Sequence, residues 1–359
     1  MDINSEELKY LLALSHQHRN ATRKVHTLLE QYGSATYFFK KHSEHFSEEA
    51  LQKAQTELQF IEQHKIDVHY FKEESYPYRL VNCIDNPILL FTRGTFDFQH
   101  GKCVAIVGTR TPTERGKELC RQFILDLAQK VNDLVIISGL AYGIDITAHR
   151  AALEANIPTY IVLGHGLDTI YPSLHRDVVV KALTQGGVIS EYLSGVKPDR
   201  HNFIFRNRII AGLADAVVVV ESKEKGGSLI TAQTASDYNR DLFAFPGRVS
   251  DTFSAGCNQL IKKQQAYLIE NADDVIDKMG WEKKPTTSIQ TDIFDVELNL
   301  SGQEQVLLQI IRSNEDGIYI NNLVSESQMN YADIMPALLR MEIEGIIKAL
   351  PGNVYMALK

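Results

Sequence analysis

The stretch that decides the fold runs from Arg200 to Ser222 and reads RHNFIFRNRIIAGLADAVVVVES. Its first part, 200–214, predicts a helix. The apolar run AVVVVE at 216–221 predicts a strand buried on both faces. The next residues, KEKGGSLITA at 223–232, predict a glycine-rich turn that carries lysine. A helix that leads into a buried strand, with a turn at the strand's carboxyl end, is typical of a parallel α/β sheet.

The same stretch reverses the sign of the charge locally. The chain has a formal net charge of −8, yet no acidic residue lies between Asp199 and Asp215. Arg200, Arg206 and Arg208 fall in that interval. Three guanidinium groups beside a turn rich in backbone N–H groups predict an anion site large enough for several phosphates. The alternative is that the arginines form a solvated helix face.

Length and composition bound the class of protein. A chain of 359 residues, 44% hydrophobic and 23% charged, predicts two to three globular domains. We expect a cytoplasmic protein without a membrane span, because no long apolar run and no signal-peptide pattern occurs. The four cysteines are far apart and form no CxxC pair, which predicts neither a disulfide framework nor a metal site. The acidic total confines any nucleic-acid binding to a patch.

The pattern divides the chain into four parts. Residues 1–66 predict a small helical module of the SAM-like kind, and 67–281 predict an α/β domain. Residues 282–298 are polar, contain Pro285 and predict a linker. Residues 299–359 predict three helices and a hairpin, which together make a winged helix.

The α/β part alternates short apolar runs with helical stretches. The runs are at 68–71, 88–91, 104–108, 134–139, 160–164, 187–190, 216–221 and 242–247. Strands that alternate with helices of ten to fifteen residues predict a doubly wound, Rossmann-like parallel sheet. Ligands of such sheets bind beyond the carboxyl ends of the strands, so the residues there are the candidate site.

Two strand ends carry glycines suited to a ligand. The turn at 107–116 has a single Gly108 where a dinucleotide fold would have GxGxxG, which disfavours NAD. Its Thr109 and Arg110 suit a phosphate instead. At the next strand end, Gly139 lets backbone amides approach a ligand.

Carboxylates also follow several strands. Asp145 and His149 are four residues apart and share a helix face. They fit an N-cap with a packed histidine, or an acid–base or metal pair, and the lack of a third ligand nearby favours the first. Asp168, Glu191 and Glu221 fit either a catalytic set or contacts that order the loops, and the sequence favours the second.

Several motifs, in a fixed order, resemble the DprA/Smf family of DNA-processing proteins. They are VGTRxPTxxG, SGLAxGID, GxGxDxxYP, SExxxGxxP, FxxRNRIIAGLAD, GGSLITA, PG and GCNQLI. The resemblance extends from about Tyr76 to Leu268. It implies a protein that binds and protects incoming single-stranded DNA, loads the RecA recombinase during natural transformation and works as a dimer. It implies no cofactor and no catalysis.

The resemblance also implies which residues contact DNA. The family's arginine of the first turn falls on Arg110, the basic residue before its glycine turn on Lys225, and its RNR pair on Arg206 and Arg208. These four cations come from different strand ends, and we expect them to converge. The predicted DNA-binding residues are Gly108, Thr109, Arg110, Gly139, Arg206, Asn207, Arg208, Lys225, Gly227, Ser228 and Thr231.

The chain departs from the family pattern in two places. Gly226-Gly227 stands where Ser-Gly is usual, which should loosen the turn but keep its amides. Phe205 stands where the family often has another arginine. An aromatic side chain there could stack a base, although burial of Phe205 is favoured.

An enzyme is the alternative to a DNA-binding protein. Nucleotide phosphoribohydrolases of the LOG family have a similar sheet and carry a PGGxGTxxE turn. Here Gln233 falls about where that glutamate would be, and no acid lies between Gly226 and Asp237. A hydrolase without this carboxylate cannot stabilise an oxocarbenium-like centre. A third option is a protein-interaction scaffold with a vestigial pocket, which the retained cations disfavour.

The C-terminal domain has the wrong charge for a duplex-binding winged helix. Residues 299–359 contain four basic side chains, Arg312, Arg340, Lys348 and Lys359. They contain seven acidic ones, Glu304, Glu315, Asp316, Glu326, Asp333, Glu342 and Glu344, which makes the net charge −3. Because non-specific duplex binding depends on phosphate contacts, we expect this domain to contact protein, either in a dimer or in a partner.

Overall fold

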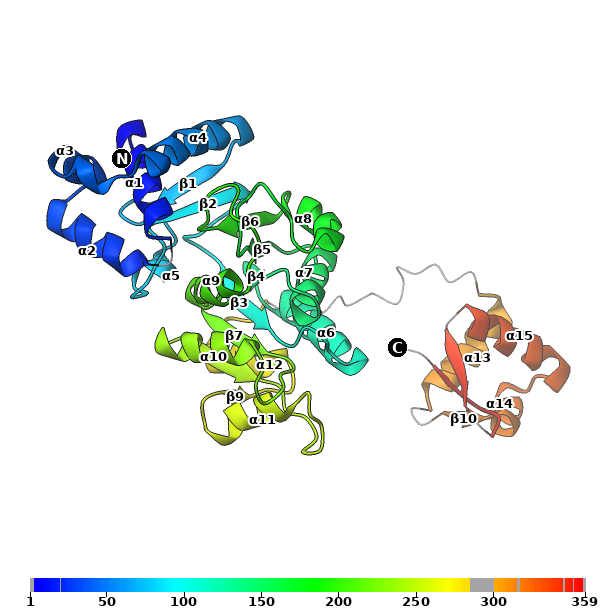
Figure 1. The fold of residues 1–359 in the computed structure, drawn as a ribbon. Coiled ribbons are helices and arrows are strands. Elements are labelled where there is room, and N and C mark those ends of the chain that lie inside the picture. The colour runs from blue at the N-terminus through cyan, green and yellow to red at the C-terminus, as the bar shows by residue number, and fades with distance from the viewer. Residues whose placement is uncertain are drawn as a thin grey trace. The chain divides into compact units, whose positions relative to one another are not determined.

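The structure is a computed structural model of the whole chain (Figure 1). It divides into two compact units, Met1–Thr286 and Thr287–Lys359. The structure describes residues 3–19, 21–284, 300–314, 317–344, 346–350 and 352–357.

Seven parallel strands form the centre of the large unit. They are β3 (Lys102–Val107), β4 (Leu134–Ser138), β5 (Thr159–Val162), β6 (Gly186–Ser190), β7 (Ala216–Val219), β8 (Asp241–Ala244) and β9 (Tyr267–Leu268). Their order is β6-β5-β4-β3-β7-β8-β9. The chain therefore adds strands on one side of β3 and then, from β7 on, on the other side. The predicted doubly wound sheet is confirmed, and the order reverses between β3 and β7.

Helices cover both faces of this sheet (Figure 1). One face packs on α6 (Glu114–Lys130), α7 (Ile144–Glu154) and α12 (Ala272–Met279). The other packs on α5 (Tyr78–Val81), α9 (Arg200–Leu213), α10 (Ser228–Asp237) and α11 (Ala255–Lys262). In β3, Val104 and Ile106 join the first core, whereas Ala105 and Val107 join the second. Because both faces are buried, the strand sequences are continuously apolar.

Two antiparallel strands extend the sheet beyond β6. β2 (Leu89–Gly94) pairs with β6 from Phe91↔Ser190 to Gly94↔Gly187, and β1 (Asp67–Tyr70) pairs with β2. The apolar runs predicted both strands, but as members of a parallel sheet, and this is wrong for β2, which runs opposite to β1 and β6. A short buried run looks the same in either orientation. Gly94 and Gly187 have φ of +135° and +150°, a conformation that favours glycine.

The N-terminal helices pack on these two strands. They are α1 (Ser5–Gln17), α2 (Thr22–Tyr32), α3 (Ala35–Lys41) and α4 (Glu48–His64), with a short 3₁₀ turn at Ser43–His45. Leu11 and Leu29 share a core with Tyr70 and Phe91. The buried carboxylate of Glu57 accepts hydrogen bonds from N and Oγ of Ser194, at 2.9 and 2.6 Å. The helices thus belong to the same compact unit as the sheet.

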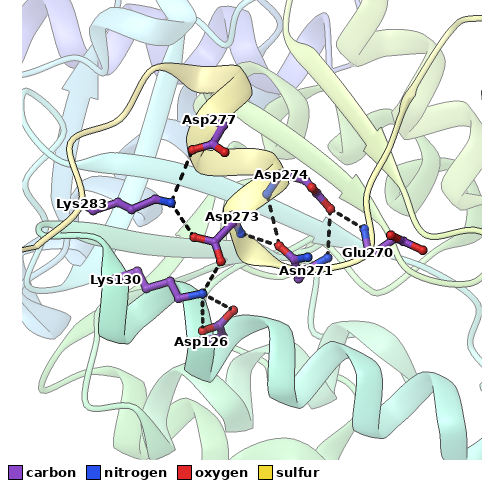
Figure 2. Close-up of polar contacts among 8 residues, drawn as sticks. All are labelled: Asp126, Lys130, Glu270, Asn271, Asp273, Asp274, Asp277 and Lys283. Carbon is purple, nitrogen blue, oxygen red and sulfur yellow. Dashed lines mark hydrogen bonds and ion pairs between the residues drawn. The ribbon is translucent and has the colours of Figure 1, made fainter. Parts of the chain in front are cut away.

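Ion pairs hold the last described residues of the large unit (Figure 2). Lys283 Nζ lies 2.7 Å from Asp273 and 3.5 Å from Asp277 of α12. Lys130, at the end of α6, lies 2.5 Å from Asp273. Lys284 N donates to Lys130 O at 2.6 Å. The first residues of the predicted linker, 282–298, are therefore attached to the sheet domain, and 285–298 lie outside the described residues.

The small unit has α13 (Gly302–Arg312), α14 (Ile320–Ser327) and α15 (Tyr331–Ile343). Its strands β10 (Ile318–Tyr319), β11 (Ile347–Leu350) and β12 (Val354–Ala357) form an antiparallel sheet in the order β10-β12-β11. Three helices and a hairpin match the expected elements, and the winged-helix assignment stays a prediction. In the described parts of both units, no helix is long and apolar enough to cross a membrane.

Candidate functional site

A groove of about 740 Å³ opens at the point where the strand order reverses. The turn after β3, the turn after β7 and one face of α9 line it. Neighbouring loops diverge at such a point because the two chain crossovers run to opposite sides of the sheet. The strand order alone therefore produces a crevice between β3 and β7, and no particular sequence motif is needed to form it.

The groove contains most of the predicted site residues. It is lined by Gly108, Thr109, Arg110, Arg206, Asn207, Lys225, Gly227, Ser228 and Thr231. Gly139 and Arg208 are not among its lining residues. Arg200, one of the three arginines of the predicted anion site, also lines it. So do Lys223 and Glu224, which were not among the predicted contacts.

Glu221 fixes the turn that presents Arg110. Its buried carboxylate accepts from Thr113 N at 2.9 Å and from Thr113 Oγ1 at 2.6 Å. Thr113 Oγ1 in turn accepts from Gly116 N at 2.9 Å and caps α6. Thr109 N donates to Glu221 O at 2.8 Å. The end of β7 thus holds the turn after β3, and the exposed Arg110 side chain stands on a fixed backbone.

The turn after β7 offers backbone amides. Gly226 N donates to Lys223 O at 3.0 Å, and Ser228 Oγ donates to Ser222 Oγ at 2.9 Å. These bonds close the turn directly before α10. Gly227 is the N-cap of α10 and supplies no side chain to the cap. Leu229 N and Ile230 N donate to Gly226 O and Gly227 O, both at 3.1 Å, so the N–H groups of Gly227 and Ser228 are the ones left to contact an anion here. Because the start of a helix carries partial positive charge, this end of the groove suits an anion.

Four cations around the groove are exposed: Arg110, Arg200, Lys223 and Lys225. The guanidinium of Arg110 lies 5.9 Å from the centre of the Phe203 ring. Lys223 Nζ lies 4.7 Å from the centre of the Phe253 ring. Long cationic side chains with few packing contacts can reach several phosphates. Lys223 was not predicted as a contact from the sequence. The signal was present, because side chains in a turn do not alternate between two faces, and both lysines of the sequence KEK can therefore be exposed.

Arg206 forms the floor of the groove. Its side chain is 3% exposed, and Nη1 donates to Gly139 O at 2.8 Å and to Val162 O. Burial lowers the pKa of Arg206 to about 10, with Asp145 opposing the shift, so the group stays charged at neutral pH. A Cβ at Gly139 would collide with this guanidinium. Gly139 therefore makes room for Arg206 rather than for a ligand.

Arg208 lies on the other side of α9, so the predicted convergence of four cations is wrong for this residue. It is 5% exposed and forms an ion pair with the buried Glu191, with Asp85 at 3.9 Å. Positions two apart on a helix differ by about 200°, so one helix cannot direct Arg206 and Arg208 into one groove. Phe205 is half-buried under Arg208, whose guanidinium lies 4.1 Å from its ring centre.

Asp145 and His149 are both buried, and Asp145 also lines the groove. Asp145 lies in the first turn of α7, after the N-cap Gly143, and accepts from Ala141 N at 3.4 Å. Burial raises the pKa of Asp145, although Arg206 and Arg110 oppose this. His149 Nδ1 lies 2.7 Å from Thr159 Oγ1. The two side chains thus have separate partners, which supports the packing interpretation. The predicted N-cap role of Asp145 is wrong, because Gly143 occupies that position and Asp145 lies inside the first turn.

The other strand-end carboxylates order loops as well. Asp168 Oδ1 accepts from Gly195 N at 3.0 Å and joins the loops after β5 and β6. Glu191 holds Arg208, and Glu221 holds Thr113. Each carboxylate serves a different loop, which supports the interpretation that they order the edge of the sheet.

His149 is expected to make folding pH-dependent. Burial lowers the pKa of His149 to about 3, and the charge of Arg206 adds to this. The ordinary value, near 6.5, applies to the unfolded chain. A depressed folded pKa gives stability that is present above about pH 6.5 and is lost as the pH falls. We expect a loss of about 2 kcal/mol between pH 7 and pH 5 from this residue.

Urea unfolding at both pH values measures this effect. His149→Gln should lose about 2 kcal/mol less than the unaltered chain on going from pH 7 to pH 5. Comparing the two chains cancels contributions from other groups such as His165, whose pKa burial also lowers. Equal losses in both chains would contradict the prediction.

The sheet order and the groove at the strand-order reversal define a Rossmann-like α/β protein with a crevice that exposed cations surround. The chain belongs to the DNA recombination-mediator protein A family, whose model matches residues 67–280.

Relatives of known sequence and structure support this assignment. The DNA processing protein DprA of Streptococcus pneumoniae is 41% identical over 204 residues, which are 57% of this chain and 71% of that protein. The protein Smf of a Synechocystis species is 33% identical over 331 residues, covering 83% and 82% of the two chains.

Two solved structures are also similar. The X-ray structure of the Streptococcus pneumoniae protein has a TM-score of 0.65 at 31% identity and covers 77% of this chain and 99% of that one. The DNA processing protein A of Helicobacter pylori, solved to describe its single-stranded DNA binding mode, has a TM-score of 0.54 at 31% identity. It covers 60% of this chain and 95% of that one.

Proposed function

We propose that this chain binds single-stranded DNA, with phosphates held in the groove between β3 and β7. The observation that carries the proposal is the gathering of four exposed cations around a helix N-terminus at this point. Membership of the family and the binding described for the Helicobacter pylori protein support it. A single strand is held by charge that follows its backbone and by stacking of its free bases.

A binding titration at two salt concentrations tests the proposal, with a single-stranded oligonucleotide and the matching duplex. Each neutralised phosphate of a single strand should contribute roughly −0.7 to the slope of log affinity against log salt. Four cations therefore predict a slope of about −3. The proposal would be contradicted if the protein bound neither the oligonucleotide nor the duplex at low salt, or if it bound both with affinities that do not depend on salt.

The proposal includes no catalysis. Gln233, where a phosphoribohydrolase would have its glutamate, is exposed on α10 and donates to Asp237 Oδ1 at 2.9 Å. The groove lining on α10 ends at Thr231. Of the carboxylates near the strand ends, Asp168, Glu191 and Glu221 hold neighbouring segments. Asp145 and Glu224 line the groove. Release of free base from a nucleoside monophosphate would contradict this part of the proposal.

The resemblance of the motifs extends the proposal to a role for the chain. It would act as a dimer in the cytoplasm, protect incoming single strands during natural transformation and load the RecA recombinase. The four cysteines are free thiols, as is usual in a reducing compartment. Faster assembly of the recombinase on a single strand coated with a single-strand-binding protein would support loading, and an unchanged rate would contradict it.

Deletion of everything after Lys284 is expected to leave single-strand affinity within a few-fold of the full chain. Residues 299–359 have a sequence net charge of −3, which repels phosphates. Ending the chain at Lys284 keeps the contacts of Lys283 and Lys284 with α6 and α12. Affinity, circular dichroism and oligomeric state are measured together. A large loss of affinity in a folded truncation with the same oligomeric state would show that the small unit binds DNA.

A further inference from the structure

Aromatic side chains continue the edge of the sheet beyond the cationic groove. Tyr142 follows β4, and Tyr171 lies in the loop after β5, so both stand at the carboxyl ends of the parallel strands. Their side chains are 47% and 48% exposed. Phe203, on α9, lines the groove itself. The strands run in the order β7-β3-β4-β5, so cations occupy one part of this edge and aromatic rings the next.

Tyr171 and Phe203 form a stacked pair. Their ring centres are 5.8 Å apart, and the ring planes differ by 24°. The guanidinium groups of Arg110 and Arg206 lie 5.9 and 6.0 Å from the centre of the Phe203 ring. A Cβ at Gly164 would stand 2.8 Å from Phe203 Cδ1, so this glycine lets the ring pack closely at the end of β5. Phe203 is therefore fixed between the cations and the exposed tyrosine.

We propose that Tyr171, supported by Phe203, stacks a base of the DNA strand whose phosphates lie in the groove. This inference rests on the proposed function and adds a base subsite to it. An aromatic ring that is already held parallel to a second ring loses little conformational freedom when a base covers it. Base–aromatic stacking tolerates every sequence, because each base has a π face.

The distances along the sheet suit a short strand. Neighbouring strands lie about 4.8 Å apart, so β5 is about 14 Å from β7. A single strand that follows the edge can place phosphates beside Arg110 and Lys225 and a nearby base over Tyr171. The bases of a duplex are stacked on one another and cannot reach this ring without unpairing. The subsite thus favours single-stranded over duplex DNA.

The test separates bases from phosphates. Affinities of the full-length chain are measured for an oligothymidylate and for an abasic strand of the same length. Tyr171→Leu should lose roughly fivefold to a hundredfold in affinity for oligothymidylate and little for the abasic strand. Tyr171→Phe should keep the affinity of the unaltered chain. The matched control is Tyr37→Leu, since Tyr37 is 50% exposed on α3, in the N-terminal helical layer.

The outcomes distinguish this inference from the proposed function. If the unaltered chain binds neither oligothymidylate nor the abasic strand, the proposed function and the base subsite are both wrong. If it binds both strands equally well, or if Tyr171→Leu binds oligothymidylate as tightly as the unaltered chain, phosphate binding stands and the base subsite is wrong. Equal losses for both strands would show that Tyr171 acts through the shape of the groove and would also overturn the subsite. Photo-cross-linking of a 5-iodouracil strand to Tyr171 would give direct support.

Discussion

Arg208→Ala is expected to lower the free energy of unfolding of the large unit by about 3–5 kcal/mol. The substitution leaves the carboxyl group of Glu191 without its partner, in a side chain that is only 5% exposed. Removing one member of a buried ion pair costs more than the pair contributes, because the remaining charge has lost its water as well as its partner. Urea unfolding followed by circular dichroism measures the loss.

A double substitution supplies the control. Arg208→Met combined with Glu191→Leu removes both charges and keeps similar volume, and should restore most of the lost stability. The folded fraction of either variant should bind single strands within a few-fold of the unaltered chain, since Arg208 faces away from the groove. A stable Arg208→Ala protein with much weaker DNA binding would show instead that Arg208 contacts the strand.

Arg110→Ala combined with Lys225→Ala is expected to weaken single-strand binding by roughly 30- to 1,000-fold at low salt. Each charge-assisted contact contributes about 1–2 kcal/mol, and contacts on separate turns should add. The slope of log affinity against log salt should also fall by about 1.4, because two phosphates are no longer neutralised. Both side chains are exposed, so the melting temperature should not change.

Arg93→Ala is the matched control for this pair. Arg93 is exposed on β2 and pairs with Val188 in the middle of β6. Three strands, β6, β5 and β4, separate β2 from β3, so Arg93 lies away from the groove. The Arg93→Ala substitution removes one positive charge and leaves the residues of the groove unchanged. If Arg93→Ala weakens binding as much per charge as the double variant does, binding depends on the overall charge and not on the groove.

The local sequence was sufficient to predict the helices and strands and most of the residues that line the groove. Strands such as β3 and β7 are continuously apolar because helices cover both their faces, and this pattern can be recognised from the sequence alone. The glycine turn and the cations Arg110 and Lys225 also follow strands directly. Since parallel strands end at one edge of a sheet, their proximity could be predicted from the sequence.

The roles of the two buried arginines could not be taken from the motif. Both belong to RNR, yet Arg206 donates to a carbonyl group directly after β4 and to one at the end of β5, whereas Arg208 pairs with Glu191 after β6. Their spacing of two on a helix contained the signal that they face opposite ways. The partner of each depended on the strand order, which arises from pairings between distant segments and is not encoded in any short stretch.

The pairing of β2 with β6 has a consequence for how the chain is made. β2 ends at Gly94, but its partner on one side, Gly186–Ser190, is about a hundred residues later. At synthesis rates of about 5–20 residues per second, the ribosome needs roughly 5–20 s to make the residues between β2 and that partner. Throughout this interval an unpaired strand edge is open to wrong pairing. The nascent chain should therefore depend on chaperones until residue 190 has left the exit tunnel.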